Sequence, residues 1–404
     1  MATVYAGIDW SDGWLDCAVV HRDGTRLGHC RITRAGNTDP VGEYLAFLQR
    51  HSRLWRGVPT AIEDPSLLIV EDMLARGMTV VHVDATLAAR TRKAQSPGGE
   101  RKNDVEDAYL LAGMLRGGAF RPLALASPEV RAIRVLAHAQ AAAVATRSRT
   151  LNRLRTVLTA YHPAAVTAWG KRGLRHREAR AVLAVASSPG AAAALSRAQF
   201  AAALRAGGRW RTVVDEAERL CLLFLRSRGL RVHPVVEAAR EVEMLSVLDE
   251  LTQACVRADG LAERVSVLFG RHPYYPVLVS FPGVGDTMGA RILGEIGDIG
   301  RFTVRGLCAY AGVTPVTWSS GTMRRDSLRR AVNGHLRRAL TQAAMTSLLH
   351  SPGAAAYYRA RRERGCAHFT SLRAVGARMA RCLHHCLTHG EAYDEEAAWG
   401  PAGR

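Results

Sequence analysis

The sequence predicts an α/β domain at the N-terminus, an all-α arm in the middle and a mostly α domain toward the C-terminus of this 404-residue chain. Three observations support this. Short β-rich runs give way to alternating helix and strand patterns in residues 1–126; residues 127–272 are Ala- and Arg-rich with helical spacing; and residues 273–365 begin with a Pro-Gly-x-Gly turn between two helical patterns. Residues 366–404 form a predicted helical tail.

The N-terminal elements follow one another in a recognisable order. Residues 3–9, 14–21 and 26–33 are β-rich runs joined by Ser-Asp-Gly and Arg-Asp-Gly turns, which predicts a three-stranded meander. A helix, a strand, a helix and a strand are then predicted at residues 40–50, 59–63, 66–76 and 79–84, before a last helix that begins near Asp104. Three antiparallel strands followed by alternating helix and strand are typical of an RNase H-like domain.

Four carboxylates fall where that fold would bring them together. Asp9 ends the first strand, Glu63 ends the fourth, and Asp104 and Asp107 are three residues apart and therefore share one face of the last helix. Carboxylate oxygens are the ligands that Mg²⁺ prefers, so the pattern predicts a site for Mg²⁺ or Mn²⁺. Each acid also has a simpler explanation on its own, as a turn former, a surface acid or a charge that stabilises a helix N-terminus.

The middle segment is predicted to be helical almost throughout. Ser127 and Pro128 form a helix start, and apolar residues then recur at helical spacing up to Tyr161. Breaks are expected at residues 187–190 and 207–208. We expect a helical or coiled-coil arm that dimerises and also follows a phosphate backbone; its basic run 171–180 is either a solvated face or a nucleic-acid contact.

The third region contains two features suited to phosphate. The turn at 281–285 resembles a helix-hairpin-helix, in which the backbone N–H groups of Gly283 and Gly285 would contact a DNA phosphate, although an ordinary tight αα turn is the alternative. Ser320 precedes Gly321 and a basic stretch, and it is either a hydroxyl presented to phosphate or only a loop serine. The arginines of this stretch are Arg324, Arg325, Arg329, Arg330, Arg337 and Arg338.

Composition narrows the classes of partner. The net charge of +19 and a pI near 10.4 favour polyanions, above all nucleic acid. No apolar run approaches twenty residues, so we expect a cytoplasmic protein without a membrane partner. The eight cysteines are scattered without paired spacing, which indicates reduced thiols. Among the Cys and His residues of 366–389, helix packing is favoured over a zinc site.

Taken together, these motifs resemble the insertion-sequence 110 transposases, which are related to the pilin-gene invertase. The resemblance covers residues 1–126 and 275–365, whereas the middle is similar only in being helical. It rests on Gly7-Ile8-Asp9, Ala61-Ile62-Glu63, Lys102-Asn103-Asp104-Val105-Glu106-Asp107-Ala108, Pro282-Gly283-Val284-Gly285, Tyr310-Ala311-Gly312-Val313-Thr314-Pro315, Ser320-Gly321 and Leu336-Arg337-Arg338-Ala339-Leu340. The sequence departs from the family pattern after Glu63, where Asp64-Pro65-Ser66-Leu67 follows, and at Val332, where glycine is usual.

The resemblance implies a chemistry. Family members pair a RuvC-like domain, which bears an Asp-Glu-Asp-Asp (DEDD) set, with a domain that bears a nucleophilic serine. Carried over, the four acids named above would bind magnesium, and Ser320 would form a covalent phosphoserine link to DNA. Lys102 and the arginines from 324 onward would position the nucleic-acid backbone rather than specify bases.

The resemblance also implies partners: double-stranded donor and target DNA, a structured guide RNA encoded beside the gene, and a homodimer or tetramer in which the acids and the serine meet between protomers. Two alternatives remain open from the residues. One is a metal-dependent nuclease or Holliday junction resolvase in which Ser320 only contacts phosphate. The other is an inactive nucleic-acid-binding scaffold.

Overall fold

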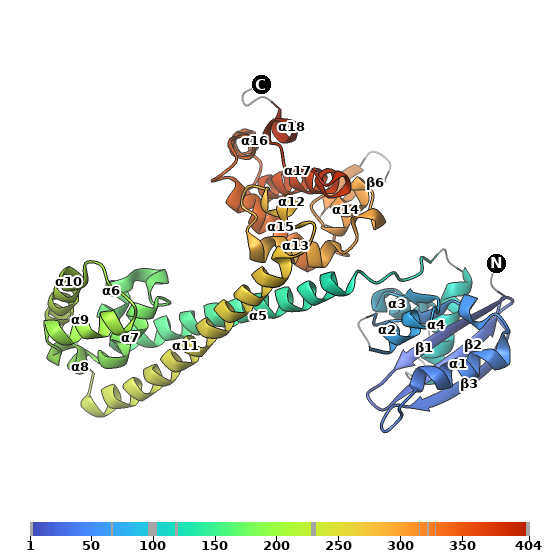
Figure 1. The fold of residues 1–404 in the computed structure, drawn as a ribbon, viewed down its shortest axis with the longest axis horizontal. Coiled ribbons are helices and arrows are strands. Elements are labelled where there is room, and N and C mark those ends of the chain that lie inside the picture. Colours follow the sequence, from blue (N-terminus) through green and yellow to red (C-terminus); the bar gives the residue numbers. More distant parts are fainter. Residues whose placement is uncertain are drawn as a thin grey trace. The chain divides into compact units, whose positions relative to one another are not determined.

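The chain forms two compact units, Met1–Leu125 and Ala126–Arg404 (Figure 1). The structure is a computed structural model, which describes residues 3–65, 68–95, 103–117, 120–227, 232–314, 316–320, 323–327 and 329–400. The four-part division expected from the sequence is finer than these two units and stays a prediction.

The first unit is built on a mixed five-stranded sheet. Its strands are β1 (Val4–Trp10), β2 (Trp14–His21), β3 (Arg26–Thr33), β4 (Thr60–Ile62) and β5 (Val80–His82), in the order β3-β2-β1-β4-β5. The first three are antiparallel, which confirms the predicted meander, whereas β4 runs parallel to β1 and β5 runs parallel to β4. This arrangement is consistent with the RNase H-like order of elements.

Helices cover both faces of this sheet. Alternation along β1 separates the faces: Ala6 and Ile8 are buried in the core shared with α1 (Pro40–His51) and α2 (Leu68–Ala75). The opposite face packs against α3 (Ala85–Gln95) and α4 (Asp104–Gly117). Helix α3 was not predicted, because its sequence carries no continuous apolar stripe and Ala88 is the residue that it buries in this core.

Two long helices organise the second unit. They are α5 (Pro128–Tyr161), which Ser127 caps by accepting a hydrogen bond from the Val130 N–H at 3.3 Å, and α11 (Pro234–Gly270). They pack along each other and run antiparallel, since the start of α5 and the end of α11 belong to one core and their other ends belong to a second (Figure 1). The expected arm is thus a helical hairpin. The residues that connect its two long helices fold into a small helical bundle.

That bundle forms the core at one end of the long helices. It comprises α6 (Pro163–Gly173), α7 (Arg177–Val185), α8 (Pro189–Ala194), α9 (Arg197–Ala206) and α10 (Val213–Arg226). The chain breaks between α7 and α8 and again after α9, as the Ser-Ser-Pro-Gly and Gly-Gly sequences predict.

The other end of the long helices shares a core with the C-terminal elements. These are α12 (Tyr275–Val279), α13 (Asp286–Ile296), α14 (Val304–Tyr310), strands β6 (Val316–Ser320) and β7 (Met323–Ser327), α15 (Gly334–Ser347), α16 (Pro352–Glu363), α17 (His368–His389) and α18 (Glu395–Trp399). Ile133 of α5, Phe269 of α11 and Leu383 of α17 are all fully buried there. The predicted tail therefore packs in the same core as the segment before it.

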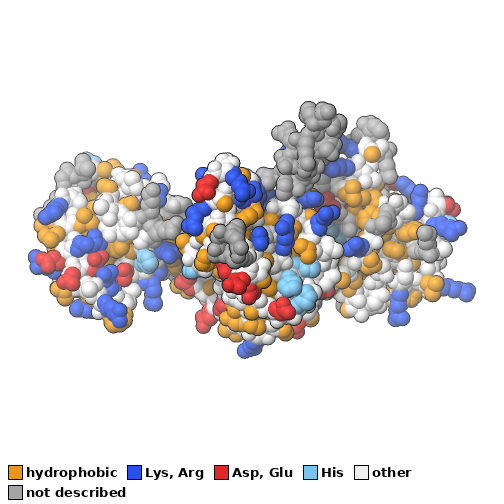
Figure 2. All heavy atoms as spheres, turned by 90° about the horizontal axis from the view of Figure 1, so that it is seen from above, with side chains coloured by type: hydrophobic (Ala, Val, Ile, Leu, Met, Phe, Trp, Pro, Cys, Tyr) orange, Lys and Arg blue, Asp and Glu red, His pale blue; other side chains and the backbone are white. Residues whose placement is uncertain are grey.

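The surface is basic. Figure 2 shows Lys and Arg side chains spread over the visible face, with fewer acidic side chains among them, as the net charge of +19 requires. The cysteines are free thiols, and Cys386 of α17 is buried in the C-terminal core. Within the described residues, no helix combines the length and the apolar character needed to cross a bilayer.

Candidate metal centre and serine hairpin

Asp9 and Glu63 lie at the same end of two neighbouring strands. Gly7 pairs with Ala61 and Ile8 with Ile62 in the parallel β1–β4 ladder, so Asp9 and Glu63 follow at adjacent positions. Parallel strands are about 4.8 Å apart, and residues two apart along a strand share a face. Both acids are therefore on the face of Gly7 and Ala61, which is the face that α4 covers.

Helix α4 approaches this face closely at Gly7. A Cβ atom at Gly7 would lie 2.2 Å from the Ala108 carbonyl oxygen and 2.6 Å from the Ala112 nitrogen, so only glycine permits the approach. Tyr5 packs in the cluster of Leu115, hence α4 runs antiparallel to β1 and its first turn points toward the Asp9 end of the strand. The four predicted carboxylates thus lie toward the same end of the sheet.

Asp107 is the most buried of these acids. Its side chain is 5% exposed, and its Oδ1 accepts a hydrogen bond from Arg92 Nε of α3 at 2.6 Å. Its Oδ2 is buried with no hydrogen-bond partner within the described part of the chain. A buried carboxylate oxygen without a partner is costly, and a bound cation is one way to satisfy it. Carboxylates are the donors that Mg²⁺ and Mn²⁺ prefer. Among the described residues, however, no three of these four acids have ligand oxygens within 4.8 Å of one another, so the four-acid metal site stays a prediction.

A fifth acid stands beside the cluster and was not singled out in the sequence. Asp16 lies directly opposite Asp9 in the β1–β2 ladder and is fully buried. It accepts hydrogen bonds from His29 Nε2 at 2.8 Å and from Arg31 Nη2 at 2.9 Å. The bond to Asp16 and, to a smaller extent, the charge of Asp104 raise the pKa of Arg31. The feature of the sequence that could have identified Asp16 is that it is the single acid within the apolar run of β2.

Two further residues of the motif at 102–108, Glu106 and Lys102, were also considered in the sequence. Glu106 points away from the cluster, as its spacing predicts, and forms an ion pair with Arg26 at 2.5 Å that lowers the pKa of the Glu106 carboxyl. Lys102 lies outside the described residues, so its predicted role stays a prediction.

In the second unit, the two glycines of the predicted helix-hairpin-helix have different surroundings. Gly283 has φ +82°, and a Cβ atom there would lie 2.8 Å from the Ser347 nitrogen at the end of α15, so its position reflects packing. Gly285 is exposed, caps the start of α13 and has open space around it. Of the two, Gly285 is therefore the one placed to offer a backbone N–H to phosphate.

Ser320 is the last residue of β6. Its partner in the antiparallel β6–β7 ladder is Met323, and Arg324 and Arg325 follow in β7 opposite Ser319 and Trp318. We call residues 316–327 the serine hairpin. The structure describes only the backbone of residues 316–320 and 323–327 in it, so the Ser320 hydroxyl and the two guanidinium groups stay predictions as a site.

The other predicted arginines lie after the hairpin. Arg329 is half-buried with an Nε that has no partner among the described residues, and Arg330 is exposed. On α15, Arg337 is half-buried and Arg338 is exposed, with its Nη2 3.4 Å from His335 Nδ1. These residues provide positive charge around the segment that carries Ser320.

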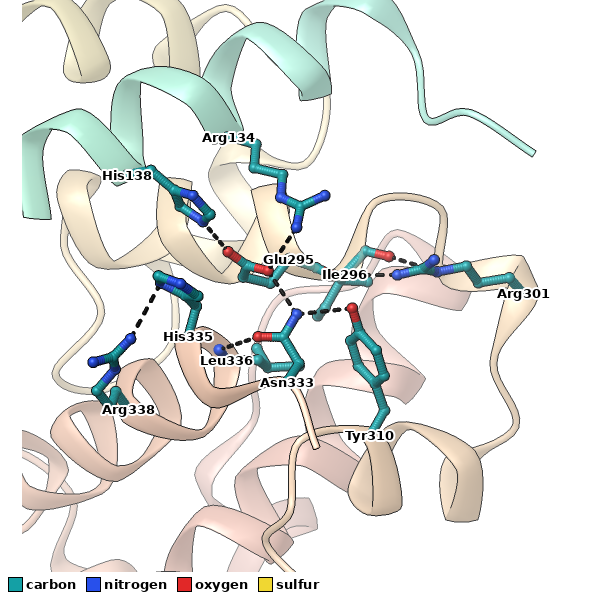
Figure 3. Close-up of polar contacts among 10 residues, drawn as sticks. All are labelled: Arg134, His138, Glu295, Ile296, Arg301, Tyr310, Asn333, His335, Leu336 and Arg338. Atoms are coloured by element: carbon teal, nitrogen blue, oxygen red, sulfur yellow. Dashed lines mark hydrogen bonds and ion pairs between the residues drawn. The ribbon is translucent and has the colours of Figure 1, made fainter. Parts of the chain in front are cut away.

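A polar network centred on one buried acid lies beside the base of the hairpin (Figure 3). Glu295 of α13 is 3% exposed and bonds to His138 of α5 and Asn333. His138, Glu295 and His335 are the one set of three candidate metal ligands in the described residues whose atoms lie within 4.8 Å of one another. This trio was not predicted; the signal in the sequence was the single acid, Glu295, within the apolar run 292–296 at the end of α13.

Comparison with known proteins places the chain in a family. A family model described as a transposase matches residues 6–163, and one described as transposase IS116/IS110/IS902 family matches residues 275–359. A Streptomyces coelicolor protein named as a mini-circle transposase for IS117 is 39% identical over 99% of this chain and 97% of its own length. The chain belongs to the IS110 family of transposases.

Other relatives of this transposase come from insertion elements as well. An IS110 protein of Streptomyces coelicolor is 30% identical over 78% of this chain and 77% of its own length. An IS116 protein of Streptomyces clavuligerus is 26% identical over 94% of this chain and 93% of its own length. The resemblance inferred from the motifs is thereby confirmed: the protein is a DNA transposase, and the DEDD type of the first model suggests dependence on a divalent metal.

Proposed function

We propose that this transposase cuts and rejoins DNA through a covalent phosphoserine intermediate at a composite, metal-supported site. Asp9, Glu63, Asp104 and Asp107 would hold Mg²⁺ or Mn²⁺, and Ser320 would be the nucleophile. The observation that carries the metal half is the buried Oδ2 of Asp107, which has no hydrogen-bond partner among the described residues and lies toward the end of the sheet where β1 and β4 are followed by Asp9 and Glu63. The serine half rests on family membership and on the position of Ser320 at the end of β6.

In this proposal the serine exchanges one phosphoester bond for another. The Ser320 oxygen forms a bond to phosphorus, the bond from phosphorus to the leaving strand's oxygen breaks, and that oxygen takes up a proton while the serine proton passes to solvent. A second strand end then reverses the exchange and frees the serine. A bound divalent cation supplies stabilisation of charge on the phosphate oxygens.

Basic residues would hold the DNA backbone. Support comes from the net charge of +19, from exposed Arg330 and Arg338, and from the open N-terminus of α13 at Gly285. Charge of this kind binds polyanions without reading sequence. We therefore propose that a structured guide RNA selects the donor and target DNA.

The long helices α5 and α11 are the proposed assembly element for a homodimer or tetramer. Apolar side chains remain exposed along α11, with Val242 69% and Val256 63% exposed. Deleting residues 170–260 should reduce the mass measured by light scattering to that of a monomer, and an unchanged mass would contradict this role.

The alternative function is a metal-dependent nuclease or junction resolvase, because the acid cluster alone has the groups that phosphodiester hydrolysis needs. A scaffold that binds nucleic acid without cutting is the third outcome. The proposed function and these alternatives differ in whether protein becomes linked to DNA.

The deciding experiment incubates the protein with labelled donor and target DNA, Mg²⁺ and RNA from the segment beside the gene, and resolves the products on a denaturing gel with and without protease. We expect a protease-sensitive DNA adduct that Ser320→Ala and Asp104→Ala both abolish, whereas Ser319→Ala retains it. Free cleaved ends that survive Ser320→Ala would establish the nuclease. Binding without cleavage would establish the scaffold.

A further inference from the structure

The two ends of the segment that carries the serine hairpin are fastened to each other. Tyr310 ends α14 before the hairpin, and Asn333 caps α15 after it. The Asn333 backbone N–H donates to the Tyr310 carbonyl oxygen at 2.8 Å, and Asn333 Nδ2 donates to the Tyr310 hydroxyl at 2.8 Å. The hairpin therefore projects from a closed base.

Glu295 fixes the orientation of this base. Asn333 Nδ2 donates its second hydrogen bond to Glu295 Oε2 at 2.6 Å, and Asn333 Oδ1 accepts from the Leu336 N–H at 2.8 Å. Both N–H groups of the Asn333 amide are thus used, and a flipped amide would place its oxygen against the Glu295 carboxylate. The carboxylate dictates which way Asn333 points.

Glu295 is in turn held by α5 (Figure 3). Its Oε1 bonds to His138 Nε2, and Arg134 Nη2 lies 3.6 Å from its Oε2. A Cβ atom at Gly294 would lie 2.8 Å from the Arg134 Cα, so this glycine lets α13 approach α5 closely enough for these contacts. The chain of contacts runs from α5 through α13 to the base of the hairpin.

We propose that Glu295 is a positioning residue for the serine hairpin: through Asn333 and Tyr310 it sets the direction in which the hairpin leaves the helical core. The inference rests on the proposed function, because the hairpin carries the proposed nucleophile. A nucleophile must be held within a fraction of an ångström of its productive position, and a buried carboxylate anchored on a long helix provides that support.

A metal ion at His138, Glu295 and His335 explains the same residues less well. The His138 and His335 rings are stacked, with centroids 4.2 Å apart and planes 17° apart, and one ion cannot lie in the plane of two stacked rings. Both Glu295 oxygens already have partners, and the guanidinium groups of Arg134 and Arg338 place positive charge beside the trio.

The test reverses the polarity of one hydrogen bond in the full-length protein. Asn333→Asp places a carboxylate against Glu295 but still caps α15, because aspartate is as good a cap as asparagine. Glu295→Gln alone keeps an acceptor for Asn333. The double variant Glu295→Gln with Asn333→Asp restores the bond with donor and acceptor exchanged. Thr303→Ala, which removes the cap of α14, is the matched control for loss of a cap.

Two measurements separate positioning from folding. Hydrogen exchange of backbone amides in residues 316–327 should rise about tenfold in Asn333→Asp, stay near wild type in Thr303→Ala, and return to within about threefold in the double variant. The rate of adduct formation should follow the same order, while DNA affinity stays within about twofold. If the wild type forms no adduct, the proposed function fails, and the exchange data still decide the role of Glu295.

Three results would overturn the inference. The first is an Asn333→Asp variant whose hairpin amides exchange their hydrogens as slowly as those of the wild type. In that case only the capping of α15 by residue 333, and not its bond to Glu295, would matter. The second is a double variant no better than Asn333→Asp. The third is wild-type protein whose hairpin exchanges about tenfold faster after chelation of bound metal, which would make the trio a metal centre.

Discussion

Two buried carboxylates, Asp107 in the α/β unit and Glu295 in the helical unit, are used in opposite ways. Each is 3% exposed. Asp107 has one arginine partner on Oδ1 and leaves Oδ2 without a partner among the described residues. Glu295 has partners on both oxygens; burial raises the pKa of its carboxyl, but the bonds from His138 and Asn333 outweigh burial, so the net pKa is lowered.

The difference shows how a buried acid reveals its task. A carboxylate whose oxygens are all satisfied contributes to the fold, and removing it leaves its partners unpaired. A carboxylate with an open oxygen is destabilised until a ligand arrives. Asp107 should therefore matter most for metal binding and catalysis, and Glu295 most for stability and geometry.

The largest expected effect is that of Asp107→Asn on catalysis. Loss of one ligand charge should lower the rate of DNA cleavage on the order of a thousandfold, equivalent to about 4 kcal/mol, because the amide weakens cation binding. The free energy of unfolding in the absence of metal should change little. Titration calorimetry with Mn²⁺ and urea unfolding measure the two effects, and a large loss of stability without any loss of metal affinity would contradict the assignment of roles.

Glu295→Ala should show the reverse pattern. Truncation leaves the half-buried His138 and Asn333 without their partner, so the free energy of unfolding of the helical unit should fall by about 2 kcal/mol. Mn²⁺ affinity at the acid cluster should stay within about twofold of wild type, since Glu295 belongs to the other unit. Urea unfolding followed by circular dichroism measures the first effect, and calorimetry below the unfolding transition measures the second.

The contrast also explains what the sequence could predict. Asp9, Glu63, Asp104 and Asp107 could be predicted as a site because strand ends and i, i+3 spacing are local patterns, and because the family motifs reinforce them. Glu295, His138 and Asn333 come from segments far apart in the chain, and no local period links them. Helix α3, which supplies Arg92, was missed because it lacks an apolar stripe, so the ion pair on Asp107 was missed with it.

His162, in the core of the arm, shows how burial alone should make the free energy of unfolding depend on pH. The side chain is 1% exposed, and burial lowers its pKa from 6.5 to about 4. Below pH 6.5 the unfolded chain gains a proton that the folded arm does not, so the free energy of unfolding should fall as the pH drops from about 6.5 to about 4. The full loss is about 3 kcal/mol. His162→Gln should remove this part of the slope in urea unfolding at each pH; an identical slope in both proteins would mean that the ring titrates normally.

The smallest effect concerns the partner of Asp107. Arg92 places a positive charge on the carboxylate that would receive the cation, and its side chain is 35% exposed, so it can swing away at modest cost. Arg92→Met keeps the aliphatic stem and removes the competitor, and we expect Mn²⁺ to bind about fivefold more tightly, or about 1 kcal/mol. Arg76→Met, which breaks the exposed pairs with Asp39 and Asp72, is the matched control and should leave the affinity unchanged. Weaker binding in Arg92→Met would show that Arg92 holds Asp107 in position for the ion, and the open oxygen would then depend on the ion pair rather than compete with it.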